Sequence, residues 1–106
     1  MFSMFNNKSD QGISVNAIED LIGKVELIDI REYYEFVTGS IRTAKNIPMN
    51  QLLSQPAYYL DKSKKYYIMC QSGMRSKRTV NALQKLGYQA IDVKGGIGAY
   101  KGKHRK

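Results

Sequence analysis

The sequence predicts an α/β fold with a mainly parallel central sheet of about five strands and helices on both faces. Runs with the composition of strands alternate along the chain with runs of helical spacing. The connections between successive strand-like runs are too long for hairpins, which favours parallel pairing through crossovers. Several of these runs are almost continuously apolar, as expected for strands that are covered on both sides.

Length and composition favour one folded domain. The chain has 106 residues, of which 42% are hydrophobic and 25% are charged. No apolar run approaches the roughly 20 residues that cross a bilayer, so we expect a cytoplasmic protein without a membrane partner. One cysteine and one histidine allow neither an internal disulfide nor a zinc cage, and we expect no metal and no cofactor. We predict a loose arm at 1–11, the domain at 12–100 and a solvated basic tail at 101–106.

The net charge of +8 is unevenly distributed. Residues 1–53 carry 5 Lys/Arg and 7 Asp/Glu, whereas residues 54–106 carry 12 Lys/Arg and 2 Asp/Glu. A positive second half favours small anionic partners, because its field attracts them. Zinc-finger spacing, basic-zipper heptads and aromatic RNA-recognition signatures are missing from the sequence, so we expect no nucleic-acid partner.

The first elements follow from local patterns. Residues 12–15 are typical of a short edge strand. Asn16 followed by Glu19 predicts a capped helix that Gly23 ends. The apolar, β-branched run at 25–30 predicts a buried strand.

A short helix is expected at 31–37. Arg31 and Glu35 lie four residues apart and should pair on one face, while Tyr34 and Val37 should face inward. An extended piece, a short helix and a further helical turn are then expected at 44–47, 49–54 and 57–60.

The second half begins with a strand at 65–69 that leads to Cys70. The helix after it should bury Val80, Leu83 and Leu86 and end at Gly87. A last strand is expected at 89–93, followed by a turn at two glycines.

Cys70 is the most informative residue in the chain. It lies where a strand ends, before a short polar loop and a helix. Backbone N–H groups of such a loop and the helix dipole converge on the sulfur and favour negative charge there. Reactive sites of open α/β sheets also lie beyond the carboxyl ends of strands. We therefore predict that Cys70 is a nucleophile, and the alternative is a buried core thiol.

Three segments of the chain form a combined pattern. The first is Leu27-Ile28-Asp29-Ile30-Arg31 with Glu35-Phe36, Gly39-Ser40-Ile41 and Asn46-Ile47-Pro48. The others are the loop Cys70-Gln71-Ser72-Gly73-Met74-Arg75-Ser76 and the run from Gly95-Gly96-Ile97 to Tyr100. Together, over about residues 14–100, they resemble a single rhodanese domain. Two residues depart from the family pattern, which commonly has histidine at Ser40 and glycine at Thr43.

This resemblance implies a sulfurtransferase. Cys70 would take the sulfane sulfur of a small anionic donor, such as thiosulfate or a persulfide, and hold it as a persulfide. A thiol, cyanide or an acceptor protein would remove it, since the sequence has no second cysteine. A thiol already ionised by the loop amides would need no general base.

The resemblance also assigns the active-site loop. Gln71, Ser72, Gly73 and Met74 would lend backbone amides, and Arg75 would bind the donor anion. Ser76 is expected to cap the helix, and Asp29 and Arg31 to hold the first signature together.

Two other functional classes remain open. Cysteine phosphatases and arsenate reductases also use a loop from cysteine to arginine. In the phosphatases, five residues separate the two, against four here, and the smaller ring suits a sulfur atom better than phosphate. The third class is a non-enzymatic sulfur carrier or docking module.

Overall fold

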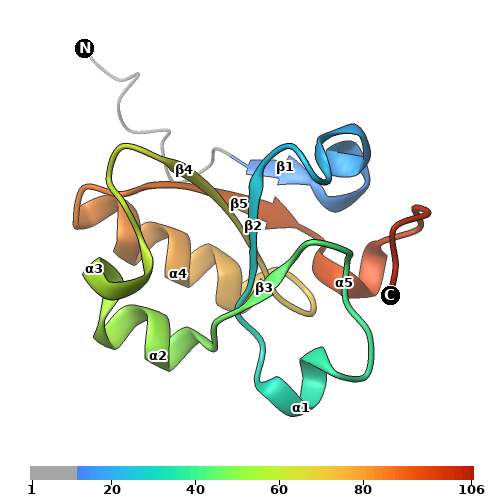
Figure 1. Cartoon of the computed structure of the whole chain (residues 1–106), viewed down its shortest axis with the longest axis horizontal. Coiled ribbons are helices and arrows are strands. Elements are labelled where there is room, and N and C mark those ends of the chain that lie inside the picture. The colour runs from blue at the N-terminus through green and yellow to red at the C-terminus, as the bar shows by residue number, and fades with distance from the viewer. Residues whose placement is uncertain (1–11) are drawn as a thin grey trace.

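The computed structural model describes residues 12–106, and the predicted arm at 1–11 lies outside the described residues. The five strands form one parallel sheet in the order β1-β5-β4-β2-β3 (Figure 1). Their bounds are Gly12–Ser14 for β1, Glu26–Asp29 for β2, Lys45–Asn46 for β3, Lys65–Met69 for β4 and Gln89–Lys94 for β5. The predicted parallel α/β sheet is confirmed.

The helices fall on both sides of this sheet (Figure 1). They are the 3-10 helix η2 at Val15–Leu21, α1 at Tyr33–Phe36, α2 at Met49–Ser54, α3 at Pro56–Tyr59, α4 at Met74–Lys85 and α5 at Gly96–Ala99. One apolar cluster joins Ile28 and Ile68 of the sheet to Leu83 of α4. A second cluster, on the opposite face, joins Leu27 to Ile18 of η2. Neighbouring strand residues therefore supply opposite cores, as the pleat requires.

The strand register brings the ends of β2 and β4 together. Asp29 pairs with Met69, and the Ile30 amide donates to the Met69 carbonyl over 2.9 Å. Cys70 and Arg31 consequently begin their loops at the same carboxyl edge of the sheet, as predicted.

Several local expectations were wrong. Ser14, and not Asn16, caps the first helix, by accepting a hydrogen bond from the Asn16 amide. The Asn16 side chain instead bonds the backbone of residues 99 and 101. Tyr34 and Val37 are largely exposed, and so is half of Leu86. Four residues of α1 make barely one turn, which leaves that helix too short to bury a continuous apolar face.

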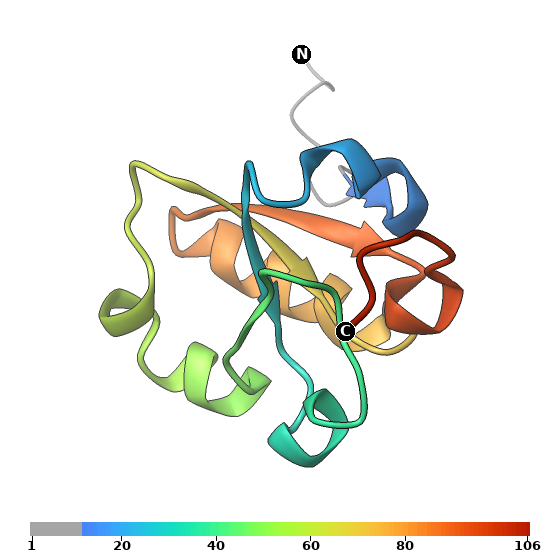
Figure 2. The ribbon, with the colours of Figure 1, turned by 45° about the vertical axis from the view of Figure 1, so that its right-hand side comes forward.

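The basic tail is not a free solvated end. The backbone of Lys106 exchanges two hydrogen bonds with Ser40, and the Arg42 amide donates to the His104 carbonyl over 2.7 Å. Glu19 accepts from the Lys103 amide over 2.8 Å. Figure 2 shows the C-terminal end lying beside the segment that follows α1. The basic side chains themselves remain mostly exposed.

Candidate active site

Cys70 follows β4 directly and is 1% exposed. Its Sγ accepts hydrogen bonds from two backbone amides, that of Gly73 at 3.1 Å and that of Ser76 at 3.3 Å. The sulfur thus lies against the first turn of α4, a helix of 12 residues whose positive dipole end faces it. This arrangement stabilises negative charge on the sulfur.

The loop depends on Gly73. This residue occupies the N-cap position of α4 with φ of +106°, a conformation that side chains rarely tolerate. A Cβ there would also approach the Gly95 amide nitrogen to 3.3 Å. Ser76 is the third residue of the helix, so the prediction that it caps α4 was wrong.

The segment with two glycines anchors the start of the loop. The Ile97 amide donates to the Cys70 carbonyl over 2.9 Å, and the Gly98 amide donates to the Gln71 carbonyl over 2.9 Å. A Cβ on Gly96 would collide with both carbonyl oxygens. Gly96 is therefore a point of close backbone approach as well as a turn residue.

A buried ion pair underlies the same edge. Arg31 is 2% exposed, and its Nη2 lies 2.9 Å from Oδ2 of Asp29. Its Nη1 donates to Oε1 of Gln71 over 3.1 Å, which links the first signature to the loop. Ser40 is buried and donates to Oδ2 of Asp29 over 2.7 Å. The serine that departs from the family pattern thus completes the hydrogen bonding of a buried carboxylate.

Arg75 is held by α1. Its Nη1 and Nη2 lie 2.9 Å and 3.0 Å from the two carboxylate oxygens of Glu35. The hydrogen bonds from Arg75 lower the pKa of Glu35 to about 2, and the same bonds raise the pKa of Arg75. The predicted pairing of Glu35 with Arg31 was wrong, because each arginine has a different carboxylate partner.

The remaining loop residues are largely exposed, although Oε1 of Gln71 accepts the hydrogen bond from Arg31. Gln71 and Ser72 are exposed, and Met74 is 76% exposed. Of the predicted loop residues, Gly73 supplies the amide that reaches the sulfur, and Arg75 contributes positive charge near it. The second amide comes from Ser76, which the sequence assigned only to a cap.

Asp92 is a site residue that the sequence did not reveal. It lies in β5, is 4% exposed, and its Oδ1 accepts a 2.6 Å hydrogen bond from the Ser76 hydroxyl. Burial raises the pKa of Asp92, whereas the Ser76 hydrogen bond lowers it in part. The sequence did contain one signal, an aspartate within the otherwise mostly apolar run 89–93. A buried acid in such a run is expected to have a hydrogen-bonding or charged partner.

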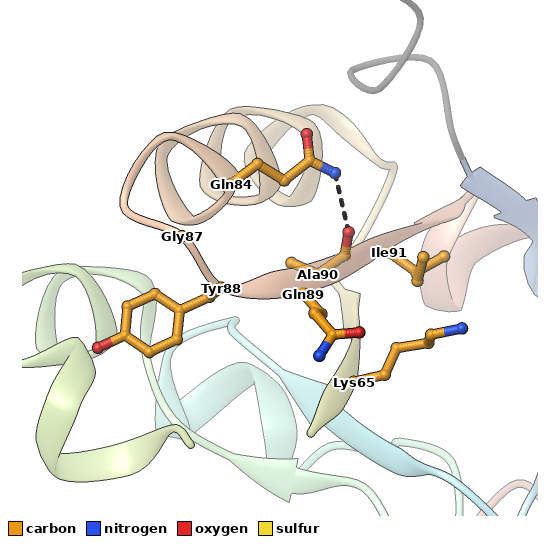
Figure 3. A pocket seen from close by; sticks show the side chains of 7 residues that line it. All are labelled: Lys65, Gln84, Gly87, Tyr88, Gln89, Ala90 and Ile91. Carbon is orange, nitrogen blue, oxygen red and sulfur yellow. Dashed lines mark hydrogen bonds between the residues drawn. The ribbon is translucent and has the colours of Figure 1, made fainter. Parts of the chain in front are cut away.

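A cavity of about 400 Å³ lies away from Cys70, at the amino ends of β4 and β5 (Figure 3). Lys65, Gln84, Tyr88 and Ile91 line it, and Gln84 donates to the Ala90 carbonyl there. None of the residues that line this cavity belongs to the Cys70 loop. Within residues 12–106, no three metal-ligating side chains gather, and no helix is long and apolar enough to cross a bilayer.

The comparisons with known proteins agree with this geometry. The family model for the Rhodanese-like domain matches residues 14–103. The chain is 37% identical to the Bacillus subtilis protein named "Putative sulfurtransferase YtwF", over 85% of this chain and 89% of that protein. It is 41% identical to the uncharacterised B. subtilis protein YqhL, over 76% of this chain and 64% of that protein.

A solved structure shows that the similarity includes the fold. The crystal structure of SSP1007 from Staphylococcus saprophyticus superposes with a TM-score of 0.81, at 29% identity. The match covers 91% of this chain and 98% of that one. Together with the family match over residues 14–103, this shows that the chain belongs to the family of rhodanese-like domains.

Proposed function

We propose that this protein transfers a sulfane sulfur through a persulfide on Cys70. The observation that carries the proposal is the position of Sγ, which accepts two backbone amides at the start of α4. A sulfur held in this way is stabilised as an anion by the dipoles of the backbone amides. A core thiol needs no such donors, and this difference favours a nucleophile over the buried-cysteine alternative.

The first step consumes the donor. The Cys70 thiolate attacks the outer sulfur of thiosulfate, a new S–S bond forms, and the old S–S bond breaks. Sulfite leaves with the electron pair, and the outer sulfur remains on Cys70 as a persulfide anion. The same amides that hold the thiolate support this anion. A persulfide donor would react in the same way and release a thiolate.

The second step regenerates the thiolate. Cyanide or a thiolate attacks the terminal sulfur, and Cys70 leaves with its electron pair. Cys70 is the only cysteine in the sequence, so the attacking thiol comes from a small molecule or an acceptor protein. We place this chemistry in a reducing compartment such as the cytoplasm, where thiol donors and acceptors persist.

Arg75 is proposed to assist the donor anion. It is 30% exposed on its side chain and already carries a bidentate carboxylate. An incoming dianion would therefore compete with Glu35 for the guanidinium. The proposal assigns Gln71, Ser72, Gly73 and Met74 to the loop around the sulfur, in which the Gly73 amide donates to Sγ.

Thiocyanate formation from thiosulfate and cyanide tests the proposal. Wild-type protein should produce thiocyanate with saturation kinetics, and Cys70→Ser should produce none above the uncatalysed rate. Equal rates for both proteins would refute the proposal. A wild-type protein that instead hydrolyses an aryl phosphate would support the phosphatase class, and slow cyanide turnover with fast transfer to a protein thiol would support a carrier.

A further inference from the structure

A chain of buried polar groups leads away from the candidate nucleophile. Sγ of Cys70 lies 3.5 Å from Oγ of Ser76, and that Oγ lies 2.6 Å from Oδ1 of Asp92. The three residues are 1%, 0% and 4% exposed. They come from the end of β4, the first turn of α4 and the middle of β5, so the fold assembles them from separate segments.

The hydrogen-bond inventory fixes the direction of this chain. The Ser76 hydroxyl has one proton to donate. Its acceptors are the Asp92 carboxylate at 2.6 Å and the Gly73 carbonyl at 3.2 Å. The shorter contact has the length of a charge-assisted bond to a carboxylate. With that proton directed at Asp92, the thiol proton is the one available between Sγ and Oγ, and Cys70 donates to Ser76.

The charges around Asp92 are few. The positive charges of Lys77 of α4 and Lys94 of β5 act on it and lower its pKa in part. The residues beside it in the sheet are Ile68 of β4 and Gly12 of β1, which carry no charged side chain. Arg75, held by Glu35 of α1, is the cation that acts on Cys70. Burial raises the pKa of Asp92 and makes its carboxylate a better proton acceptor than an exposed aspartate.

We propose that Asp92 takes the thiol proton of Cys70 through Ser76. The proton moves from Sγ to Oγ while the Ser76 proton moves to Oδ1, which leaves a thiolate, an intact serine and a neutral carboxyl. Asp92 then donates to Ser76, and Ser76 donates to the sulfur. The thiolate so gains a third donor beside the amides of Gly73 and Ser76. Asp92 does not touch the sulfur, and it is therefore a positioning residue.

This inference rests on the proposed function, because it assumes that Cys70 must ionise. It also replaces the expectation that no general base is needed. The sulfur-transfer cycle itself releases no proton from Cys70, because the thiolate and the persulfide are both anions. The relay therefore acts when the resting thiol is first activated.

The pH profile of Cys70 alkylation by neutral iodoacetamide tests the relay. In wild-type protein the proton is shared within the pair, so alkylation should rise in two steps with a plateau between them. Asp92→Asn keeps an oxygen for Ser76 but cannot take the proton, and the rate at pH 6 should fall about tenfold or more. If Asp92 acted only through its charge, Asp92→Asn would instead raise the alkylation rate at pH 6, because removing a negative charge near Cys70 favours the thiolate.

Two serine variants keep the test decisive if Asp92→Asn does not fold. Ser76→Ala should lose the low-pH step, and Ser76→Thr, which retains the hydroxyl, should keep it. Asp20→Asn removes one charge from an exposed position and should leave the profile unchanged. Unchanged or faster alkylation at pH 6 in Asp92→Asn, or an unchanged profile in Ser76→Ala, would overturn the relay.

The alkylation readout separates the two proposals, because it needs no sulfur donor. If the Asp92 and Ser76 variants lose the low-pH step but wild-type protein forms no thiocyanate, the relay is retained and the sulfurtransferase proposal is refuted. If wild-type protein forms thiocyanate but the variants have an unchanged alkylation profile, the relay is refuted and the sulfurtransferase proposal is retained.

Discussion

Thr43, at a position where the family commonly has glycine, has a strained backbone conformation. Its φ is +73°, the one positive φ of a non-glycine residue among residues 12–106. A β-branched residue is unfavourable in this region because its Cβ approaches the backbone. The Thr43 side chain is exposed, so little packing compensates for the strain.

Thr43→Gly should therefore stabilise the protein. Relief of the left-handed strain outweighs the added chain entropy, and we expect a gain of about 1 kcal/mol in the free energy of unfolding. Urea unfolding at neutral pH measures it. Thr43→Ala removes the branch but keeps a Cβ and should gain less. A loss of stability in Thr43→Gly would show that the hydroxyl or methyl group makes a contact of value.

Gly96 illustrates the other use of glycine. Its φ is +60°, and the carbonyl oxygens of Cys70 and Gln71 occupy the place of a Cβ. Gly23 also has positive φ, at +89°, but has open space around it. Both positions require a positive φ, but only at Gly96 does a neighbouring backbone segment occupy the place of a Cβ.

Alanine substitutions at these two glycines should separate conformation from contact. Gly23→Ala should cost about 1 kcal/mol, the penalty of a left-handed alanine. Gly96→Ala should cost clearly more and slow Cys70 alkylation, because α5 must move away from the loop. Equal losses of stability in urea, with unchanged alkylation, would mean that the α5 contact does not position the sulfur.

At the scale of elements, the pair of Glu35 and Arg75 fastens α1 to the start of α4. Their positions are 40 residues apart, and both side chains are partly exposed. The pKa of Glu35 falls from its ordinary 4.5 to about 2 in the folded protein. A depressed folded-state pKa means that the pair stabilises the fold fully above pH 4.5 and loses its effect as the pH falls toward 2.

Glu35→Gln should accordingly lose about 1 kcal/mol of stability at pH 7 and less as the pH falls below 4.5. Urea unfolding of both proteins at pH 7 and pH 3 measures the difference. Glu26→Gln, at an exposed position, provides the control. The variant should also lower KM for thiosulfate, because Arg75 is released for the donor. A higher KM would show that Glu35 orients Arg75 productively.

The elements also show what the sequence can and cannot predict. The bounds of β4 and α2 were predicted to the residue, because their apolar runs and the following loop or proline are local signals. The cap at Ser14 was missed because Asn16, two residues later, is an equally good capping residue by type. The exposure of Tyr34 was missed because a short helix takes its orientation from distant contacts. The sequence predicted the Cys70 loop as a segment. It did not predict the hydrogen bond between Ser76 and Asp92, because that contact depends on the order of the strands in the sheet.

At the scale of the whole molecule, the positive charge should guide anionic donors. The net charge is +8, with most cations in the half that holds Cys70. We expect kcat/KM for thiosulfate to fall severalfold as ionic strength rises, because salt screens long-range attraction. Alkylation by neutral iodoacetamide should not change over the same range. A thiosulfate rate independent of salt would show that the donor arrives without electrostatic guidance.

Cys70 is proposed to carry the transferred sulfur. Protein treated with thiosulfate that bears a heavy sulfur isotope only in the outer position should gain the mass of one labelled sulfur. Peptide mapping should place the label on Cys70, and cyanide should release it as labelled thiocyanate. Absence of a mass gain, or the same gain in Cys70→Ser, would contradict the account.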